Sequence, residues 1–167
     1  AKVCGPACAI SLVALVNAKT ARKKAKAVRA ADKVALAKFK TRSDWIKSAQ
    51  VAFNAFIRER DKDQPCISSG RPLQAGAIGG GFDAGHYRSI GSAPHLRYDE
   101  RNVHGQSKQD NRYLAGNAVD YRIGLIKRRG LAEVEELEAD NEPRKHSIAD
   151  LMALESTYKL KLKELQA

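Results

Sequence analysis

The sequence is poor in aromatic residues and in cysteines. Aromatics make up 6% of the 167 residues, and three cysteines cannot build the disulfide framework of a small secreted domain. An apolar run over residues 7–18 is too short to cross a bilayer, and it lacks the basic segment and cleavage pattern of a secretory signal. We find no internal repeat and no Gly-rich phosphate loop followed by a helix. We therefore expect a soluble cytoplasmic protein with no membrane partner and a thin core, because alanine supplies much of its apolar content.

Acidic residues are scarce near the N-terminus. Residues 1–47 hold 12 of the 30 Lys and Arg residues but two of the 19 acidic ones, a net charge of +10, and the other 120 residues carry +1. Residues 9–40 contain no Gly or Pro and are rich in Ala, Lys and Arg, which predicts a long basic N-terminal helix. Charge confined to one end favours a polyphosphate partner. The predicted DNA-contacting residues of this arm are Arg22, Lys23, Lys24, Lys26 and Arg29. The alternatives are a solvated helix that happens to be basic and an arm that lies against another protein.

The rest of the chain predicts a mainly helical domain. We place the basic arm in residues 1–40 and one domain in residues 41–167. Apolar residues recur at three- and four-residue spacing over residues 45–57, which is the strongest amphipathic pattern in the chain. Burial of this stripe is favoured over stacking of its rings on bases. Further helices are predicted over residues 117–129, over residues 131–140 and from Ser147 onward, where Ser147 and Asp150 form a capping-box variant.

Residues 81–117 have the spacing of a small ββα-metal unit of the HNH nuclease type. A first strand would carry His86, a second strand would reach residues 102–104, and a helix would carry Asn111 on its first turns. Phosphodiester hydrolysis needs an activated water and a cation that neutralises the phosphate. We assign His86 as the general base, with Asn102 holding its ring by a hydrogen bond.

Asn111 is the predicted metal ligand in this unit, through its amide oxygen. Asp83 is the carboxylate that would join it, although strand alternation places Asp83 and His86 on opposite faces unless the chain bends at Gly85. Phosphate contacts are predicted for Arg88, His104 and Arg112. Each of these residues alone is more often structural, because a lone histidine usually packs in a core and a lone asparagine usually caps a turn.

Two short segments have the spacing of a zinc knuckle without its cysteines. Cys66 and Ser69 are separated by two residues, and Ser107 and Asp110 have the same spacing. Neutral hydroxyls are weak zinc ligands, so a structural Zn²⁺ is doubtful and the knuckle is interpreted as vestigial. The remnant pair of Cys4 and Cys8 in the arm is at most half of a zinc site, and free thiols are the alternative.

Five segments carry a resemblance to a known family. They read TRSDWIKSAQVAFNAFIRERD, DAGHYRS, PHLRYDERNVHGQ, DNRYLAGN and DYRIGLIKRRGL. In these segments the chain resembles the NinG/Rap family of lambdoid phage recombination proteins, from about residue 40 to the C-terminus. The resemblance implies a structure-specific endonuclease that cuts Holliday junctions and D-loops with Mg²⁺ or Mn²⁺. Family members usually carry Cys-x-x-Cys at both knuckle positions, so the family's zinc is in doubt for this chain.

Three functions remain open from the sequence. The first is a metal-dependent nuclease that holds branched DNA with its basic arm. The second is a catalytically inactive protein that binds branched DNA. The third is a phage recombination scaffold whose long helices form a homodimer or hold a partner protein.

Overall fold

The chain divides into two compact units in the computed structural model, which describes residues 5–37, 39–74 and 81–167. The units are Ala1–Thr41 and Arg42–Ala167. The first contains one 32-residue helix, α1 (Pro6–Ala37), on which the five predicted DNA-contacting side chains are exposed. Cys8 is exposed at its start, and Cys4, the other half of the predicted pair, lies outside the described residues.

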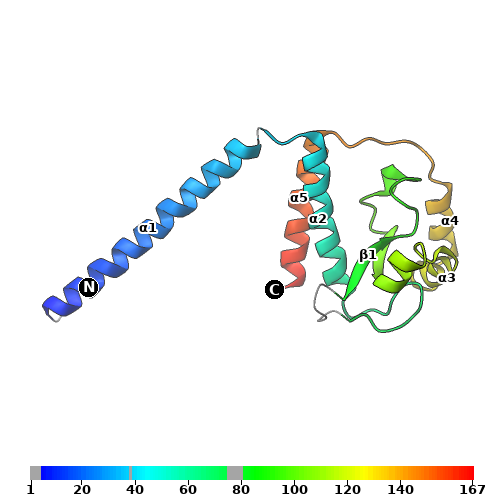
Figure 1. The fold of residues 1–167 in the computed structure, drawn as a ribbon, viewed down its shortest axis with the longest axis horizontal. Helices are drawn as coiled ribbons and strands as arrows, with labels where there is room; N and C mark the ends of the chain where they lie inside the picture. The colour runs from blue at the N-terminus through cyan, green and yellow to red at the C-terminus, as the bar shows by residue number, and fades with distance from the viewer. Residues whose placement is uncertain (1–4, 38, 75–80) are drawn as a thin grey trace. The chain divides into compact units, whose positions relative to one another are not determined.

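Two helices form one side of the second unit. α2 (Arg42–Arg60) and α5 (Ile148–Leu165) lie side by side (Figure 1), and α2 buries the apolar stripe predicted from its spacing. The ring of Phe53 on α2 meets Tyr158 of α5 edge to face, with centroids 4.7 Å apart, and meets Tyr98 at 5.8 Å. Such aromatic pairs stabilise a core beyond the area they bury. The prediction of burial over base stacking is therefore confirmed for Phe53.

A two-stranded ribbon is the one sheet among the described residues. β1 (Phe82–His86) pairs with β2 (Val103–Ser107) in antiparallel register without interruption. Because side chains alternate along a paired strand, Asp83 and His86 lie on opposite faces. Gly85 does not bend the strand. It leaves room instead for Gln106 on β2, whose side-chain oxygen would lie 2.1 Å from a Cβ at position 85.

Short helical turns connect the ribbon to two packed helices. The loop after β1 contains a 3₁₀ turn, η1 (Pro94–Leu96), and β2 leads into a one-turn π-helix, η2 (Gln109–Tyr113). The chain continues into α3 (Ala118–Arg129) and α4 (Leu131–Ala139), which are separated by Gly130 at φ +90°. That backbone angle favours glycine, and it ends α3.

A second part of the core lies between α3, α4 and the loops. Its buried members are Ile67, Ala93, Leu96, Tyr121, Leu125, Val134 and Leu137. Gly124 of α3 lies directly against the loop that carries Ile67, since a Cβ at position 124 would be 1.7 Å from the Ile67 carbonyl oxygen. Only glycine allows the helix backbone to approach this closely.

The predicted helices of the C-terminal half are confirmed. α3 and α4 match the helices expected over residues 117–129 and 131–140, and α5 opens with the predicted capping box, in which Ser147 and Asp150 exchange hydrogen bonds. The described chain is mainly helical with a small two-stranded sheet, as expected. Among the described residues, no helix is both long enough and apolar enough to span a bilayer.

Candidate functional site

Asp83, Asn111 and Arg112 form a compact group that we call the Asp83 cluster. Asn111 Nδ2 donates to Asp83 Oδ2 at 3.0 Å, and Arg112 donates from Nε to Oδ2 at 2.7 Å and from Nη2 to Oδ1 at 2.8 Å. The hydrogen bonds from Arg112, followed by the one from Asn111, lower the pKa of Asp83. Strand β1 and the π-helix η2 thus bring the two predicted metal ligands together, with a guanidinium across both carboxylate oxygens.

The oxygen donors of the Asp83 cluster are of the type that a hard divalent cation takes. Mg²⁺ commonly uses one or two carboxylates with water, and an amide oxygen is a suitable further ligand. Asp83 and Asn111 therefore fit such an ion in chemical type. Both Asp83 oxygens, however, already accept hydrogen bonds from Arg112. Within the ranges that the structure describes, no three His, Cys, Asp or Glu side chains gather into a metal-holding group.

His86 lies at the end of β1, and its ring is held by the main chain. Its Nε2 atom is 3.0 Å from the carbonyl oxygen of Arg97 in the loop between the strands. A carbonyl oxygen can only accept, so Nε2 carries the hydrogen and Nδ1 keeps its lone pair in the neutral ring. Burial lowers the pKa of His86, which favours this neutral form. The arrangement suits a group that accepts a proton.

Asn102 does not hold the ring of His86 as predicted. Its side-chain oxygen accepts from Arg88 N at 2.8 Å, and its Nδ2 donates to Arg88 O at 3.0 Å and to Leu96 O at 3.2 Å. Main-chain groups of the loop thus bind both the oxygen and the nitrogen of the Asn102 side-chain amide. Because Leu96 precedes Arg97, Asn102 fixes the loop whose carbonyl orients His86, and its support of the ring is indirect.

The structure does not assemble His86 and Asn111 around one point. His86 contacts Arg97, whereas Asn111 contacts Asp83 on the other face of the ribbon. The three residue steps from Asp83 to His86 separate their Cα atoms by about 10 Å along the strand. The bend at Gly85 on which a single site depended is absent from the paired register.

Arg88 and His104, two of the residues with predicted phosphate contacts, form hydrogen bonds within the fold. The guanidinium of Arg88 donates to the main-chain oxygens of Leu137 at 3.0 Å and Asp140 at 2.6 Å, and thereby caps the end of α4. His104 is 2% exposed, its Nδ1 lies 3.4 Å from the hydroxyl of Tyr121, and burial lowers its pKa to about 3. The His104 ring is buried and the Arg88 guanidinium caps a helix, so this arrangement does not itself support a phosphate contact, and both contacts stay predictions. The prediction for Arg112 is not tested, although its guanidinium pairs with Asp83.

The four residues of the interpreted knuckle meet with Asn117 around the buried carboxylate of Asp110, and we call this group the Asp110 cluster. Asp110 is 4% exposed and accepts at Oδ2 from Ser107 Oγ at 2.6 Å and from Cys66 Sγ at 3.3 Å. Asn117 Nδ2 donates to its Oδ1 at 3.0 Å, and Ser69 adds another hydrogen bond. Burial raises the pKa of Asp110, but these hydrogen bonds outweigh it and lower the pKa to about 2.

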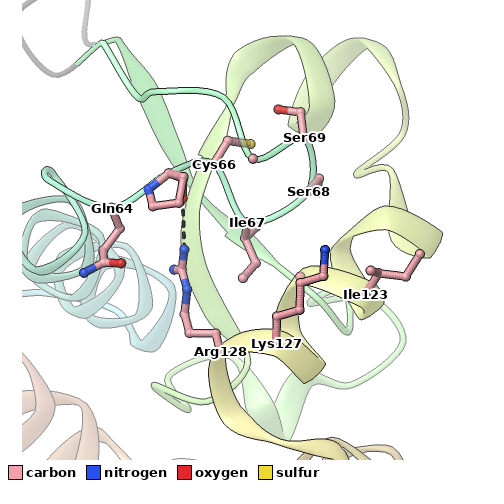
Figure 2. Close-up of a pocket in the computed structure, with 11 residues that line it drawn as sticks. Gln64, Cys66, Ile67, Ser68, Ser69, Ile123, Lys127 and Arg128 are labelled. Atoms are coloured by element: carbon pink, nitrogen blue, oxygen red, sulfur yellow. Dashed lines mark hydrogen bonds between the residues drawn. The ribbon is translucent and has the colours of Figure 1, made fainter.

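The Asp110 cluster does not fit a structural zinc ion. Zinc requires deprotonated thiolates or imidazoles as its strong ligands, and this group offers one thiol and two hydroxyls that donate to a carboxylate. Figure 2 shows Cys66 and Ser69 on the loop opposite Ile123 and Lys127 of α3, with the hydrogen bond from Arg128 Nη2 to Pro65 O, 2.9 Å long, closing the other side. Hydrogen bonds to Asp110 join these side chains to one another.

Two residues that sequence reasoning missed complete these groups. Arg97 acts through its carbonyl, which carries no signal in the sequence. Asn117 has a left-handed φ of +45° just before α3, and its amide reaches back to Asp110. A Gly-Asn pair at a helix boundary is the signal that could have identified Asn117, since asparagine tolerates this backbone region.

Comparison with known proteins shows the family. The sequence model described as "Bacteriophage Lambda NinG protein" matches residues 1–167. The chain belongs to the NinG family. The NinG relatives are about half identical in the matched region. "Protein ninG" of Salmonella phage P22 is 48% identical over 127 residues, and that of Escherichia phage lambda is 46% identical over the same length.

Each of these NinG alignments covers 76% of this chain and 60% of the relative. The chain thus spans about three fifths of the length of the curated relatives it matches. No solved structure is similar to it. The family resemblance predicted from the five sequence segments is confirmed.

Proposed function

We propose that this NinG-family chain binds branched DNA and hydrolyses its phosphodiester bonds with Mg²⁺ or Mn²⁺. The observation that carries the proposal is the state of His86. Its ring is neutral, its Nε2 is fixed by the Arg97 carbonyl, and its Nδ1 is left with a lone pair for the proton of an attacking water. The ribbon that carries His86 and leads into η2 and α3 is interpreted as an HNH-like ββα unit.

The metal in this proposal would be held by Asp83 and Asn111. A bound divalent cation supplies charge neutralisation on the phosphate and on the leaving oxygen. This chain's own residues hold the proton acceptor on one face of the ribbon and the oxygen donors on the other. Because Asp83 and His86 lie on opposite faces and about 10 Å apart along the strand, the two groups would have to come together on the bound DNA before they could act on one phosphate. Arg112 would release Asp83 and turn to the phosphate.

DNA binding is proposed to use the exposed basic side chains of α1 together with cations of the second unit. Branched DNA is the substrate class that the family resemblance implies, and the host cytoplasm is the compartment in which such DNA is found. A homodimer would suit a symmetric four-way junction.

The Asp110 cluster is proposed to take over the role of a metal in holding the loop of Cys66 to η2. Its hub, Asp110, directly precedes Asn111 in the chain. A cluster that fixes Asp110 therefore fixes the start of the segment that carries the proposed metal ligand.

The test is cleavage of a synthetic four-way junction by the full chain in Mg²⁺ and in Mn²⁺. His86→Ala should lower the cleavage rate by about 100-fold or more and leave junction binding unchanged. Added imidazole should restore part of the rate, because it replaces the missing proton acceptor at a half-buried site. Unchanged cleavage by His86→Ala would show that the assigned base is wrong, and loss without rescue would indicate a structural role.

A second function is favoured by a specific observation. Both carboxylate oxygens of Asp83 are held by Arg112, and His86 faces away from this group. These features suit a protein that binds branched DNA and leaves it uncut. Tight junction binding by the natural chain, with no cleavage in either metal, would favour this function over hydrolysis.

A further inference from the structure

A basic pocket lies in the second unit, close to His86 and away from the Asp83 cluster. It has a volume of about 380 Å³ and lies between the start of α2, the loop after β1 and the segment that joins α4 to α5. Its polar lining consists of Arg42, Arg97, Arg144, Lys145 and His146, and no acidic side chain lines it. We call it the basic pocket.

Three of these cations are not neutralised by a carboxylate. The guanidinium of Arg42 donates to the carbonyl oxygen of His146 at 3.1 Å, and Arg97 Nη1 lies 3.5 Å from the amide oxygen of Gln50. Lys145 is exposed and forms no ion pair among the residues that the structure describes. Neutral acceptors orient a cation without cancelling its charge, so the pocket keeps a strong positive potential.

Carboxylates lie near the pocket as well, among them Asp99 and Glu142, which act on Arg144 electrostatically, and two others are held by neighbouring groups. Asp140 forms an ion pair with Arg144 at 2.6 Å, and Asp150 accepts from the main-chain nitrogen of Ser147 at 2.7 Å in the capping box of α5. Arg144 is therefore the one lining cation with a carboxylate partner among the described residues. The surplus charge comes from Arg42, Arg97 and Lys145.

His146 contributes an unsatisfied polar atom to the same wall. Its Nε2 is buried and has no hydrogen-bond partner in the described part of the chain, and its ring packs edge-on against Tyr98 at 5.3 Å. A buried polar atom without a partner costs stability, and a ligand that offers an acceptor or a donor would remove this cost. An anionic oxygen is the acceptor that the surrounding cations attract.

Arg97 joins the basic pocket to the proposed catalytic base. Its side chain lines the pocket, while its carbonyl oxygen accepts from His86 Nε2. Resting on the proposed function, we infer that the basic pocket binds a backbone phosphate of the DNA strand that passes His86. A phosphate held by the Arg97 side chain would then lie on the strand near the cleavage position, since the same residue orients the base.

The main test compares two variants that lose equal charge. The variant R97Q/K145Q removes two cations of the basic pocket and keeps the Arg97 carbonyl, whereas K127Q/K163Q removes two exposed lysines that do not line it. Binding of each full-length chain to a fluorescent four-way junction is measured by anisotropy against salt, in EDTA so that no cleavage occurs. Thermal melts establish that both variants fold.

We expect R97Q/K145Q to bind about 10-fold more weakly and to lower the log–log salt slope by about 1, because the pocket holds one phosphate. K127Q/K163Q should leave the slope unchanged. Equal losses in both variants would mean that only total charge matters, and natural affinity in R97Q/K145Q would mean that the pocket is unused. Either result overturns the inference. Neither depends on cleavage, so the hydrolytic proposal is judged separately.

A second measurement uses inorganic phosphate alone. Millimolar phosphate should shift the imidazole resonances of His146 in the natural chain, leave them unshifted in R97Q/K145Q, and compete with junction DNA. A phosphate shift without competition would place DNA elsewhere and overturn the assignment to a strand phosphate.

Discussion

Asp110 within η2 and Asp83, which contacts η2 from strand β1, have opposite surroundings. Asp110 opens η2 from inside the protein and accepts from hydroxyl, thiol and amide groups, which are all neutral. Asp83 meets the same segment one and two residues later, but its main partner is a guanidinium on a side chain that is 56% exposed. The buried Cys66 thiol cannot leave Asp110 without losing its acceptor, whereas an exposed guanidinium can exchange its carboxylate for water or phosphate.

The contrast separates a fixed carboxylate from an exchangeable one. Asp110 is suited to hold structure, because its ionised form is surrounded by oriented donors. Asp83 is suited to change partners, because its ion pair lies near solvent. Asp110 of the structural cluster and Asn111 of the proposed metal site are neighbours in the chain.

The largest expected effect comes from removing the fixed carboxylate. Asp110→Ala should lower the free energy of unfolding by about 3 kcal/mol, because the buried Cys66 thiol and the half-buried Ser107 and Asn117 lose their acceptor. Urea denaturation followed by circular dichroism measures the change. Asp83→Ala, whose partners can turn to water, should cost less than about 1 kcal/mol. Equal costs for the two variants would remove the distinction between them.

The same comparison predicts a pH dependence. The pKa of Asp110 is lowered to about 2 in the folded chain, against about 4 for an unfolded aspartate. A lowered folded pKa gives a stability contribution that is complete above the unfolded pKa and is lost as the pH falls through the folded value. The stability difference between the natural chain and Asp110→Ala should therefore be constant near neutrality, shrink below pH 4 and be smallest near pH 2. A difference that stays constant to pH 2 would contradict the hydrogen-bonded hub.

A smaller effect tests the exchangeable carboxylate. Arg112→Ala should raise the affinity for Mn²⁺, measured by calorimetry without DNA, by about 2- to 5-fold, which is the scale of a partly exposed ion pair. Asp83→Asn is the matched control and should abolish the binding. If Arg112→Ala leaves the Mn²⁺ affinity unchanged, the guanidinium does not compete with the ion.

The smallest expected effect concerns zinc. Chelation with EDTA should change the melting temperature of the natural chain by less than about 1 °C, because hydrogen bonds hold the Asp110 cluster. The variant S69C/S107C/D110C provides the positive control, since four thiolates at these positions should take up one Zn²⁺ and become sensitive to the chelator. A marked loss of stability in the natural chain on chelation would show that a metal contributes to its fold.

The helices of the second unit followed from the sequence because local rules decide them, whereas α1 spans Pro6–Ala37 and not residues 9–40 as predicted. The stripe over residues 45–57 and the Ser147 cap act within a few residues of themselves, so spacing alone located α2 and α5. The sequence also indicated that the segments 66–69 and 107–110 meet. Two residues separate the ends of each segment, which is the spacing of the two facing turns in a zinc knuckle. The residue types, with one thiol, two hydroxyls and one carboxylate, already indicated a cluster held by hydrogen bonds.

The candidate site was harder to predict because its contacts run through the main chain. Asn102 spends its amide on the carbonyls of Arg88 and Leu96, and His86 is oriented by the carbonyl of Arg97. No side-chain pattern marks a carbonyl acceptor. Gly85 misled in a similar way, since a glycine in a strand can permit a bend or can make room for a neighbour, and here it makes room for Gln106.

The contact between Gly124 and the Ile67 carbonyl leaves no clearance for even one methyl group. A Gly124→Ala chain would have to move α3 away from the Cys66 loop, and the displacement would reach Asp110 and Asn111 through residues that are otherwise unaltered. Position 124 is thus a place where a single methyl group would make the fold sensitive to temperature, with every side chain of the proposed chemistry intact.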